Sequence, residues 1–197
     1  KARLAFSTIG QLSYIVLGIA ILSPLSTAGA LYHLVAHAFM KITLFMCAGA
    51  IFVTTHKKDI SEMVGLGRRM PVTMSAFTIA SLGIAGFPFF VGFVSKANII
   101  MGALKTGQLL FGATLIVSAV LALTYLMPVV LITFKREPVN SEFNAYGEAS
   151  KTMLAPLLIT ATVSVILGVV PNFGLHLLDL AMSTGEAVFA HVGGVIC

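Results

Sequence analysis

Long apolar runs separated by short polar segments make up most of this chain. Some of these runs reach the ~20 residues that a helix needs to cross a bilayer. They cover residues 4–22, 27–54, 109–134 and 152–171. Ser23 and Pro24 end the first run, and Pro128 predicts a kink near the end of the third. The pattern therefore predicts an all-α fold, a polytopic bundle of transmembrane helices.

The stretch from 71 to 104 fits two interpretations, either two separate spans or one span broken in the middle. Its halves are each only about 13 to 16 residues long, which is short for a full crossing. Gly83, Gly86 and Pro88 lie between the halves and disfavour a continuous helix. A break at membrane depth leaves backbone groups unpaired, which is tolerated beside protein or a water-filled cavity. We therefore expect a polar site near this break.

The positions of the basic residues favour the single, discontinuous span. If 71–104 crosses once, nearly all Lys and Arg residues outside the apolar runs fall on one side of the membrane. That side holds Lys1, Arg3, Lys57, Lys58, Arg68, Arg69, Lys135, Arg136 and Lys151. Lys105 falls on the other side. The positive-inside tendency therefore predicts five spans, with the chain starting on the cytoplasmic or matrix side.

The tail from 174 to 192 is more mixed than the runs before it. It contains Asp179 and Glu186 among apolar residues, which is typical of an amphipathic helix at the membrane interface. The pattern as a whole divides the chain into three parts. We expect transmembrane helices of an ion-translocation half over 1–135, a cytoplasmic-side loop over 136–151, and a C-terminal transmembrane helix with an amphipathic tail over 152–197.

Composition agrees with a membrane protein and argues against other classes. Of the 197 residues, 58% are hydrophobic and only 10% are charged, and the mean hydropathy is +1.01. The net charge of +5 comes from residues in short loops, without the basic and aromatic patch of a nucleic-acid-binding surface. Cys47 and Cys197 lack metal-ligand spacing, and no disulfide is expected. Because the first residue is Lys1, we interpret the chain as cut from a longer polypeptide.

The second run carries titratable residues at helical spacing. His33, His37 and Lys41 recur at i, i+4 and i+8, which places them along one stripe that rises roughly 12 Å. Lys41 lies near the middle of the run, where burying a lysine costs about 2.5 to 3.5 kcal/mol on insertion scales. Histidine changes charge near neutral pH. A column of such groups bridged by water can pass protons from one to the next.

Each of these residues also has a structural interpretation. His33 can cap a neighbouring helix or lie near the interface, His37 can form an ordinary interhelical hydrogen bond, and Lys41 can serve packing alone. Two histidines at i, i+4 also suit a metal, but the stripe offers no third ligand. We therefore expect no metal, no cofactor and no catalytic residue in this chain.

Lys96 lies in the second half of the broken span, ten residues beyond Gly86. It either extends to the membrane interface or acts as a second relay group beside the break. Three polar residues of the first run can hold water or form interhelical contacts: Ser7, Thr8 and Gln11. Between residues 4 and 134 the only carboxylates, Asp59 and Glu62, lie in a loop. A counter-ion for the lysines must therefore come from outside these runs, unless the lysines are neutral.

Four segments of the chain resemble a known family. HLVAHAFMKITLFMCAGAIF, KKDISEMVGLGRRMP and LGIAGFPFFVGFVSKANIIMGAL are similar to the antiporter-like subunits of respiratory complex I, Mrp cation/proton antiporters and membrane-bound hydrogenases, as is the opening KARLAFSTIGQLSY. The resemblance implies the second of two inverted five-helix repeats, plus a C-terminal helix. It also implies that His37 and Lys41 lie on a central hydrophilic axis with His33 close by. Lys96 would be the charged residue of the second broken helix.

The leading hypothesis is proton translocation, with Na⁺ as a second cargo, by one membrane subunit of a multisubunit complex. Its partners would be membrane lipids, other membrane subunits, H⁺ and Na⁺, without nucleic acid. The membrane would be a prokaryotic plasma membrane, with the inner mitochondrial membrane as the second choice. The alternatives are a structural membrane anchor and a redox or quinone-binding enzyme subunit. No cysteine cluster, nucleotide loop or haem motif supports the enzyme.

Overall fold

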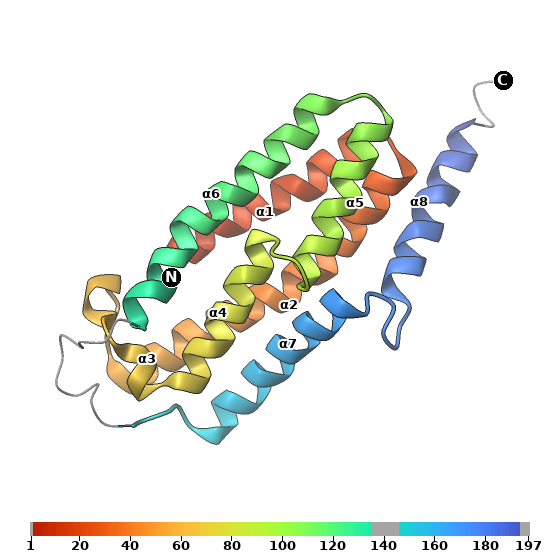
Figure 1. Ribbon diagram of the computed structural model, residues 1–197. Coiled ribbons are helices and arrows are strands. Elements are labelled where there is room, and N and C mark those ends of the chain that lie inside the picture. The colour runs from red at the N-terminus through yellow and green to blue at the C-terminus, as the bar shows by residue number, and fades with distance from the viewer. Residues whose placement is uncertain (1, 135–145, 194–197) are drawn as a thin grey trace.

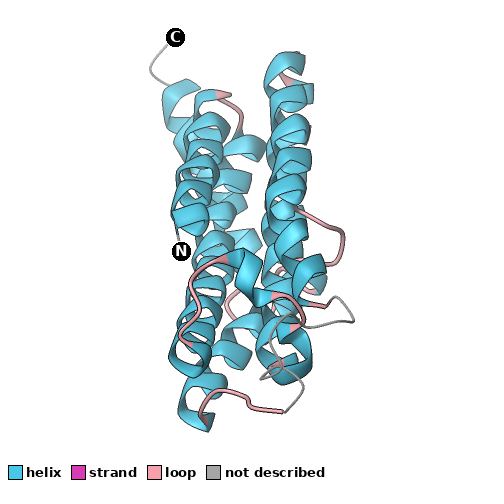
Figure 2. Cartoon of the chain, turned by 90° about the vertical axis from the view of Figure 1, so that its left-hand side faces the viewer, coloured by secondary structure: helices cyan, strands magenta, loops and turns pink. Residues whose placement is uncertain are grey.

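The computed structural model describes residues 2–134 and 146–193, and these residues form a bundle of helices that run roughly side by side (Figure 1, Figure 2). The expected all-α bundle is therefore confirmed, and the helix bounds lie close to those of the apolar runs. The helices are α1 (Ala2–Ala20), α2 (Pro24–Thr55), α3 (Leu66–Arg69), α4 (Pro71–Ala85), α5 (Val91–Lys105), α6 (Leu109–Thr133), α7 (Lys151–Val169) and α8 (Leu177–Gly193), with the 3₁₀ turn η1 (Ile60–Met63) before α3.

The central element is α2, which packs against α1, α4, α5, α7 and α8. Its 32 residues span about 48 Å at 1.5 Å per residue, which is longer than the hydrocarbon core of a bilayer. Pro24 begins the helix, where the missing N–H of proline costs no hydrogen bond. His56 ends it in a left-handed conformation, and its N–H donates to the carbonyl of Phe52. Because neighbours surround α2, its polar side chains lie inside the bundle.

A single crossing of the bundle is built from two half-helices, α4 and α5, which follow one another from end to end (Figure 1). The expected discontinuous helix is therefore confirmed. The break begins at Gly86, whose φ of 86° is left-handed and whose N–H caps the last carbonyls of α4. Pro88 lies within the break. The expectation that Gly83 also breaks the helix is wrong, because Gly83 lies inside α4, in close contact with Met40 of α2.

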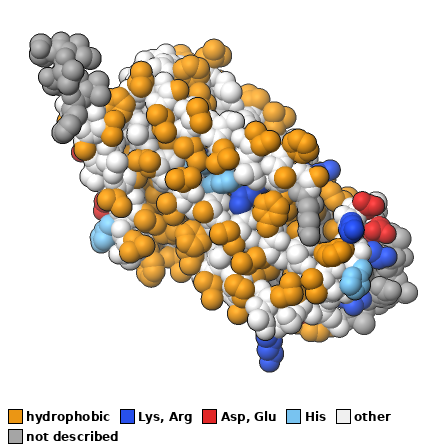
Figure 3. All heavy atoms as spheres, turned by 180° about the vertical axis from the view of Figure 1, so that it is seen from behind, with side chains coloured by type: hydrophobic (Ala, Val, Ile, Leu, Met, Phe, Trp, Pro, Cys, Tyr) orange, Lys and Arg blue, Asp and Glu red, His pale blue; other side chains and the backbone are white. Residues whose placement is uncertain are grey.

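Loops that connect the helices gather at one end of the bundle, where α2 ends and α4 and α7 begin (Figure 1). Charged side chains crowd toward this end, while hydrophobic side chains cover the length of the molecule (Figure 3). The end carries Arg68 and Arg69 as well as the lysines at 57, 58 and 151. Lys105 ends α5 at the opposite end. Lys1, Lys135 and Arg136 of the charge argument lie outside the described residues, as does 136–145 of the expected loop.

The described part of that loop caps α4. The carboxylate of Glu148 accepts the backbone N–H of Val72 at 2.6 Å and the hydroxyl hydrogen of Thr73 at 2.7 Å. A carboxylate at a helix N-terminus satisfies free N–H groups and complements the helix dipole. The segment before α7 is therefore attached to the start of the broken crossing.

The interfacial location expected for 174–192 stays a prediction. Most of this segment forms α8, which packs along the first half of α2 and runs on in the direction of α7 (Figure 1). Gly185 permits the contact, since a Cβ atom there would lie 2.5 Å from the carbonyl oxygen of Pro24. Small residues let helices approach closely in a membrane, and Gly185 allows α8 to pack directly on the backbone of α2.

Candidate functional site

The stripe on α2 lies in the interior of the bundle. His33, His37 and Lys41 are all buried, with at most 7% of the surface of each exposed. The rings of His33 and His37 are nearly parallel, with centroids 6.2 Å apart. The stripe predicted from the sequence therefore becomes a continuous column of buried basic groups.

Ser95 of α5 determines the hydrogen-bonding role of His33. The Ser95 hydroxyl donates to the carbonyl of Gly92 at 3.0 Å and lies 2.7 Å from Nδ1 of His33. Because its proton is engaged, the Ser95 oxygen accepts Nδ1–H, and a neutral His33 ring then presents Nε2 as an acceptor. Nε2 of His33 and Nε2 of His37 are buried and have no hydrogen-bond partner among the described residues. Both rings can therefore accept a proton from a bridging water.

Lys41 forms the end of the column nearer the loops. Its amine donates to the backbone carbonyl of Leu4 on α1 at 2.8 Å. Lys41 and Lys96 make no ion pair within residues 2–134 and 146–193. A backbone carbonyl offers a partner for a buried ammonium without adding a negative charge. This interaction holds the amine in place without fixing its charge.

Lys96 reaches back across the helix break. It lies on α5 with 4% of its surface exposed, and its amine donates to the carbonyl of Ile84 in the last turn of α4. The C-terminal end of a helix carries partial negative charge, which favours a cation there. A Cβ atom at Gly86 would lie 3.0 Å from Cδ of Lys96, so the break also makes room for the lysine. The two half-helices thus create a buried site for one basic group.

Tyr14 of α1 connects Lys96 to the column on α2. The Lys96 amine lies 5.0 Å from the centroid of the Tyr14 ring, within cation–π distance. The same ring packs edge-on against His33, with centroids 5.8 Å apart. Lys96, Tyr14, His33, His37 and Lys41 therefore form one row through the interior, which we call the basic row.

The polar residues predicted on α1 have different surroundings. Ser7 is hydrogen-bonded to the hydroxyl of Tyr125 on α6 at 2.7 Å. Gln11 is buried, and its Oε1 has no partner among the described residues. The hydroxyl of Thr8 donates within its own helix to the carbonyl of Leu4 at 3.1 Å. Of the three, Gln11 has a free buried acceptor beside the basic row.

Two cavities flank the basic row. One of about 420 Å³ lies between α1 and α6, and Ser7, Gln11 and Tyr14 line it. Another of about 420 Å³ lies beside the helix break, and Gly86, Pro88 and Lys96 line it. A water molecule occupies about 30 Å³ in the liquid, so each cavity has room for several. Polar side chains line much of the first cavity, which can therefore hold water beside Tyr14, whereas most of the residues that line the second cavity are apolar.

Tyr14 and Ser95 were not among the residues selected from the sequence. A signal for Tyr14 was present, because Ser7, Gln11 and Tyr14 follow helical spacing along the buried face of α1. Ser95 had no such signal, since serine is common in transmembrane helices and its partner comes from α2. Within the described residues, no group of His, Cys, Asp or Glu side chains could hold a metal ion.

A polytopic membrane bundle with a discontinuous helix and buried basic residues defines the class of this protein. The family model described as "NADH:quinone oxidoreductase/Mrp antiporter, TM" matches residues 1–122. The chain belongs to this family of antiporter-like subunits, as the resemblance in the sequence indicated.

Curated relatives support the assignment. The chain is 35% identical over 176 residues to NADH-quinone oxidoreductase subunit N of Desulforudis audaxviator, covering 84% of this chain and 35% of that protein. It is 39% identical over 173 residues to subunit L of Mycobacterium tuberculosis, covering 85% of this chain and 27% of that protein. F(420)H(2) dehydrogenase subunit L of Methanosarcina mazei is 33% identical over 190 residues, covering 88% of this chain and 28% of that protein. The chain thus spans about a third of their length or less.

Solved structures show the same fold. A chain of the Mrp complex from Dietzia sp. matches with a TM-score of 0.84 at 23% identity, covering 98% of this chain and 44% of that one. A chain of respiratory complex I from Thermus thermophilus matches with a TM-score of 0.79 at 22% identity, covering 93% and 38%. The protein is an integral membrane protein, and its bacterial and archaeal relatives point to a prokaryotic plasma membrane.

Proposed function

We propose that this chain moves protons across the membrane through the basic row, as an antiporter-like subunit of a multisubunit complex. The observation that carries the proposal is the continuity of the row: buried basic groups follow one another from Lys41 to Lys96 through His37, His33 and Tyr14. Family membership and the assembly of its relatives into complexes support the same function.

Water completes the route between the groups. The Nε2 atoms of His33 and His37 make no hydrogen bond to one another, and the ring centroids lie 6.2 Å apart. One bridging water can span such a gap. The free Nε2 atoms of both rings accept a proton, and each ring can release one through water. Tyr14 contributes its ring, which stabilises a charged Lys96. The residues with named roles are Lys41 and Lys96 as charge-holding ends and His33 and His37 as the relay between them.

Electrostatics favours alternation of charge between the two lysines. Both amines donate to backbone carbonyls and neither makes an ion pair within the part of the chain that the structure describes. Like charges in a low-dielectric interior repel one another. A proton arriving at Lys41 therefore favours the loss of a proton from Lys96, and the reverse. Electron transfer or an ion gradient handled by neighbouring subunits would drive the cycle, with Na⁺ as an alternative cargo.

The test compares Lys41→Met and Lys96→Met with Lys105→Met in the assembled complex. Methionine keeps the length of the side chain and removes the charge, so packing is disturbed little. We expect both row variants to assemble but to lose proton uptake to near background, because the row then lacks one end. Proton uptake is measured in reconstituted vesicles with an internal pH-sensitive dye.

Lys105 ends α5 outside the row and is exposed, so its variant should pump like the wild type. Normal pumping by both row variants contradicts the relay. Variants that assemble poorly and pump in proportion to the assembled amount support a structural anchor instead. A bound chromophore in the optical spectrum of the purified chain would favour the redox enzyme.

A further inference from the structure

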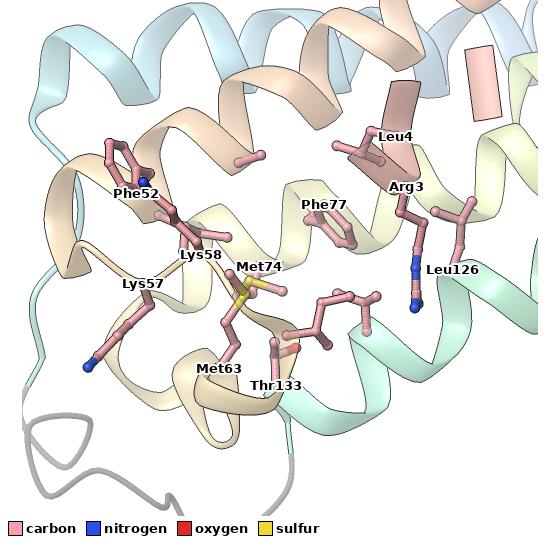
Figure 4. Close-up of a pocket in the computed structure, with 14 residues that line it drawn as sticks. Arg3, Leu4, Phe52, Lys57, Lys58, Met63, Met74, Phe77, Leu126 and Thr133 are labelled. Atoms are coloured by element: carbon pink, nitrogen blue, oxygen red, sulfur yellow. The ribbon is translucent and has the colours of Figure 1, made fainter. Parts of the chain in front are cut away.

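A cavity of about 470 Å³ lies at the loop end of the bundle, away from the centre of the basic row (Figure 4). Helices α1, α2, α4 and α6 surround it, together with the loop after α2. Its walls are apolar and buried, with Ile51, Met74, Phe77 and Leu126 each at most 5% exposed. The volume falls within the range of sites that bind small molecules. The cavity can therefore accommodate a substantial apolar group.

Cations surround the mouth of this apolar cavity. Arg3 of α1 lies on one side, while Lys57 and Lys58 lie on the other side, in the loop after α2 (Figure 4). Lys57 lies 3.8 Å from the carboxylate of Glu62, and the Lys58 amine lies 5.3 Å from the centroid of the Phe52 ring. Arg3 donates to the backbone carbonyl of Tyr125. The three cations outnumber the two carboxylates of this loop, Asp59 and Glu62, so the mouth carries a net positive charge.

We propose that this cavity binds an anionic phospholipid. An acyl chain fills the apolar interior, and the phosphate lies between Arg3 and the lysine pair Lys57–Lys58. Charge complementarity at the mouth carries the choice of occupant, because an apolar interior alone would suit any aliphatic group. The cavity also opens at the end of the bundle that holds most of the described cations, which is the end that faces a leaflet rich in anionic lipids.

The cavity lies next to one end of the basic row but is separate from it. Leu4 lines the cavity, and its carbonyl accepts the hydrogen bond of Lys41. A bound acyl chain would thus pack against the first turn of α1, which holds one end of the basic row. The lipid site does not rest on the proposed function, and its test measures binding alone.

The experiment titrates the intact complex with phosphatidylglycerol or phosphatidylcholine and counts retained lipids by native mass spectrometry. Each cation near an anionic headgroup strengthens binding about fivefold. We therefore expect Arg3→Gln and Lys58→Gln each to weaken phosphatidylglycerol binding about fivefold, without changing the weak binding of phosphatidylcholine. Lys151→Gln is the matched control, because this exposed lysine lies at the same end of the bundle and does not line the cavity.

A second variant tests the apolar interior separately. Ala48→Phe fills the cavity from α2 and leaves the three cations in place, so it should abolish retention of one phosphatidylglycerol molecule. Thermal unfolding of each variant shows whether the fold persists. Equal retention of both lipids overturns the proposal, as does equal weakening by Lys151→Gln. Occupation of the cavity by a protein segment of the intact complex, with no lipid retained there, overturns it as well.

Discussion

At the scale of single residues, the interior is organised around basic groups that have neutral partners. The carbonyl oxygens of Leu4 and Ile84 accept hydrogen bonds from the amines of the two buried lysines. The Ser95 hydroxyl oxygen accepts a hydrogen bond from His33. A buried carboxylate would stabilise a lysine cation and hold its proton, whereas a carbonyl stabilises it less. Neutral partners therefore let these groups change charge, which a mobile proton requires.

The Ser95 hydrogen bond predicts one tautomer for the neutral ring of His33. In the Ser95→Ala variant, Nδ1–H loses its acceptor, so the ring should no longer be held in that tautomer. A buried donor without a partner costs about 1–3 kcal/mol, and the free energy of unfolding should fall by a similar amount. Nitrogen NMR of ¹⁵N-histidine-labelled protein reports the tautomer. Ser118→Ala is the control, because Ser118 is hydrogen-bonded to Tyr14 and makes no contact with the His33 nitrogens. Identical tautomer populations in both variants would refute the assignment.

At the scale of elements, the break between α4 and α5 creates a binding site for the Lys96 amine inside the bundle. The C-terminal end of α4 presents carbonyl groups in the interior, and Lys96 of α5 reaches back to them across five residues, 86–90. A continuous helix would keep these carbonyl groups in its own hydrogen bonds. The break therefore supplies the acceptor that allows a lysine to be buried here.

Gly86→Ala should destabilise the protein more than a Gly→Ala substitution at a helical position. The φ of 86° costs an L-residue about 1–3 kcal/mol, and the new Cβ would press on the Lys96 side chain. We expect lower thermal stability together with impaired proton uptake. Gly10→Ala is the matched control, because its Cβ meets open space on α1 and alanine favours a helix by up to about 1 kcal/mol. A wild-type melting temperature for Gly86→Ala would contradict the strained break.

Removal of the cap on α4 should lower the stability of the protein without affecting proton transport. Glu148→Ala removes the carboxylate that accepts from Val72 and Thr73, and losing a helix cap costs about 0.5–2 kcal/mol. Thermal unfolding followed by circular dichroism should show this loss. Glu186→Ala, on the exposed side of α8, should leave the melting temperature unchanged. Equal effects of the two substitutions would exclude a specific role for the cap.

At the scale of the whole molecule, the two ends of the bundle differ in charge. Basic residues of the loops gather where α2 ends and α4 and α7 begin, and Lys105 lies at the opposite end of α5 (Figure 1). This separation depends on α4 and α5 crossing the bundle once. The same asymmetry places the cationic mouth of the lipid cavity and the Lys41 end of the basic row toward one membrane face.

Cysteine labelling tests this topology directly. Lys58→Cys and Lys105→Cys are made in a background in which Cys47 and Cys197 are replaced by serine. A membrane-impermeant maleimide added to one side of sealed vesicles should label one position and spare the other, and inverted vesicles should reverse the result. Labelling of both positions from the same side would show that 71–104 does not cross as one discontinuous span.

Hydropathy and helical periodicity determined most helices and the His33–His37–Lys41 stripe, because these features depend on residues near one another in sequence. The broken crossing also required the distribution of Lys and Arg along the chain. The position of Lys96 in the second half of the broken span, ten residues beyond Gly86, also made it a candidate. Only the tertiary structure decided that Tyr14 of α1 joins Lys96 to the α2 stripe, that Ser95 orients His33, and that α8 packs on α2. These outcomes depend on contacts between helices distant in sequence, and many helix faces of similar hydropathy could have met instead.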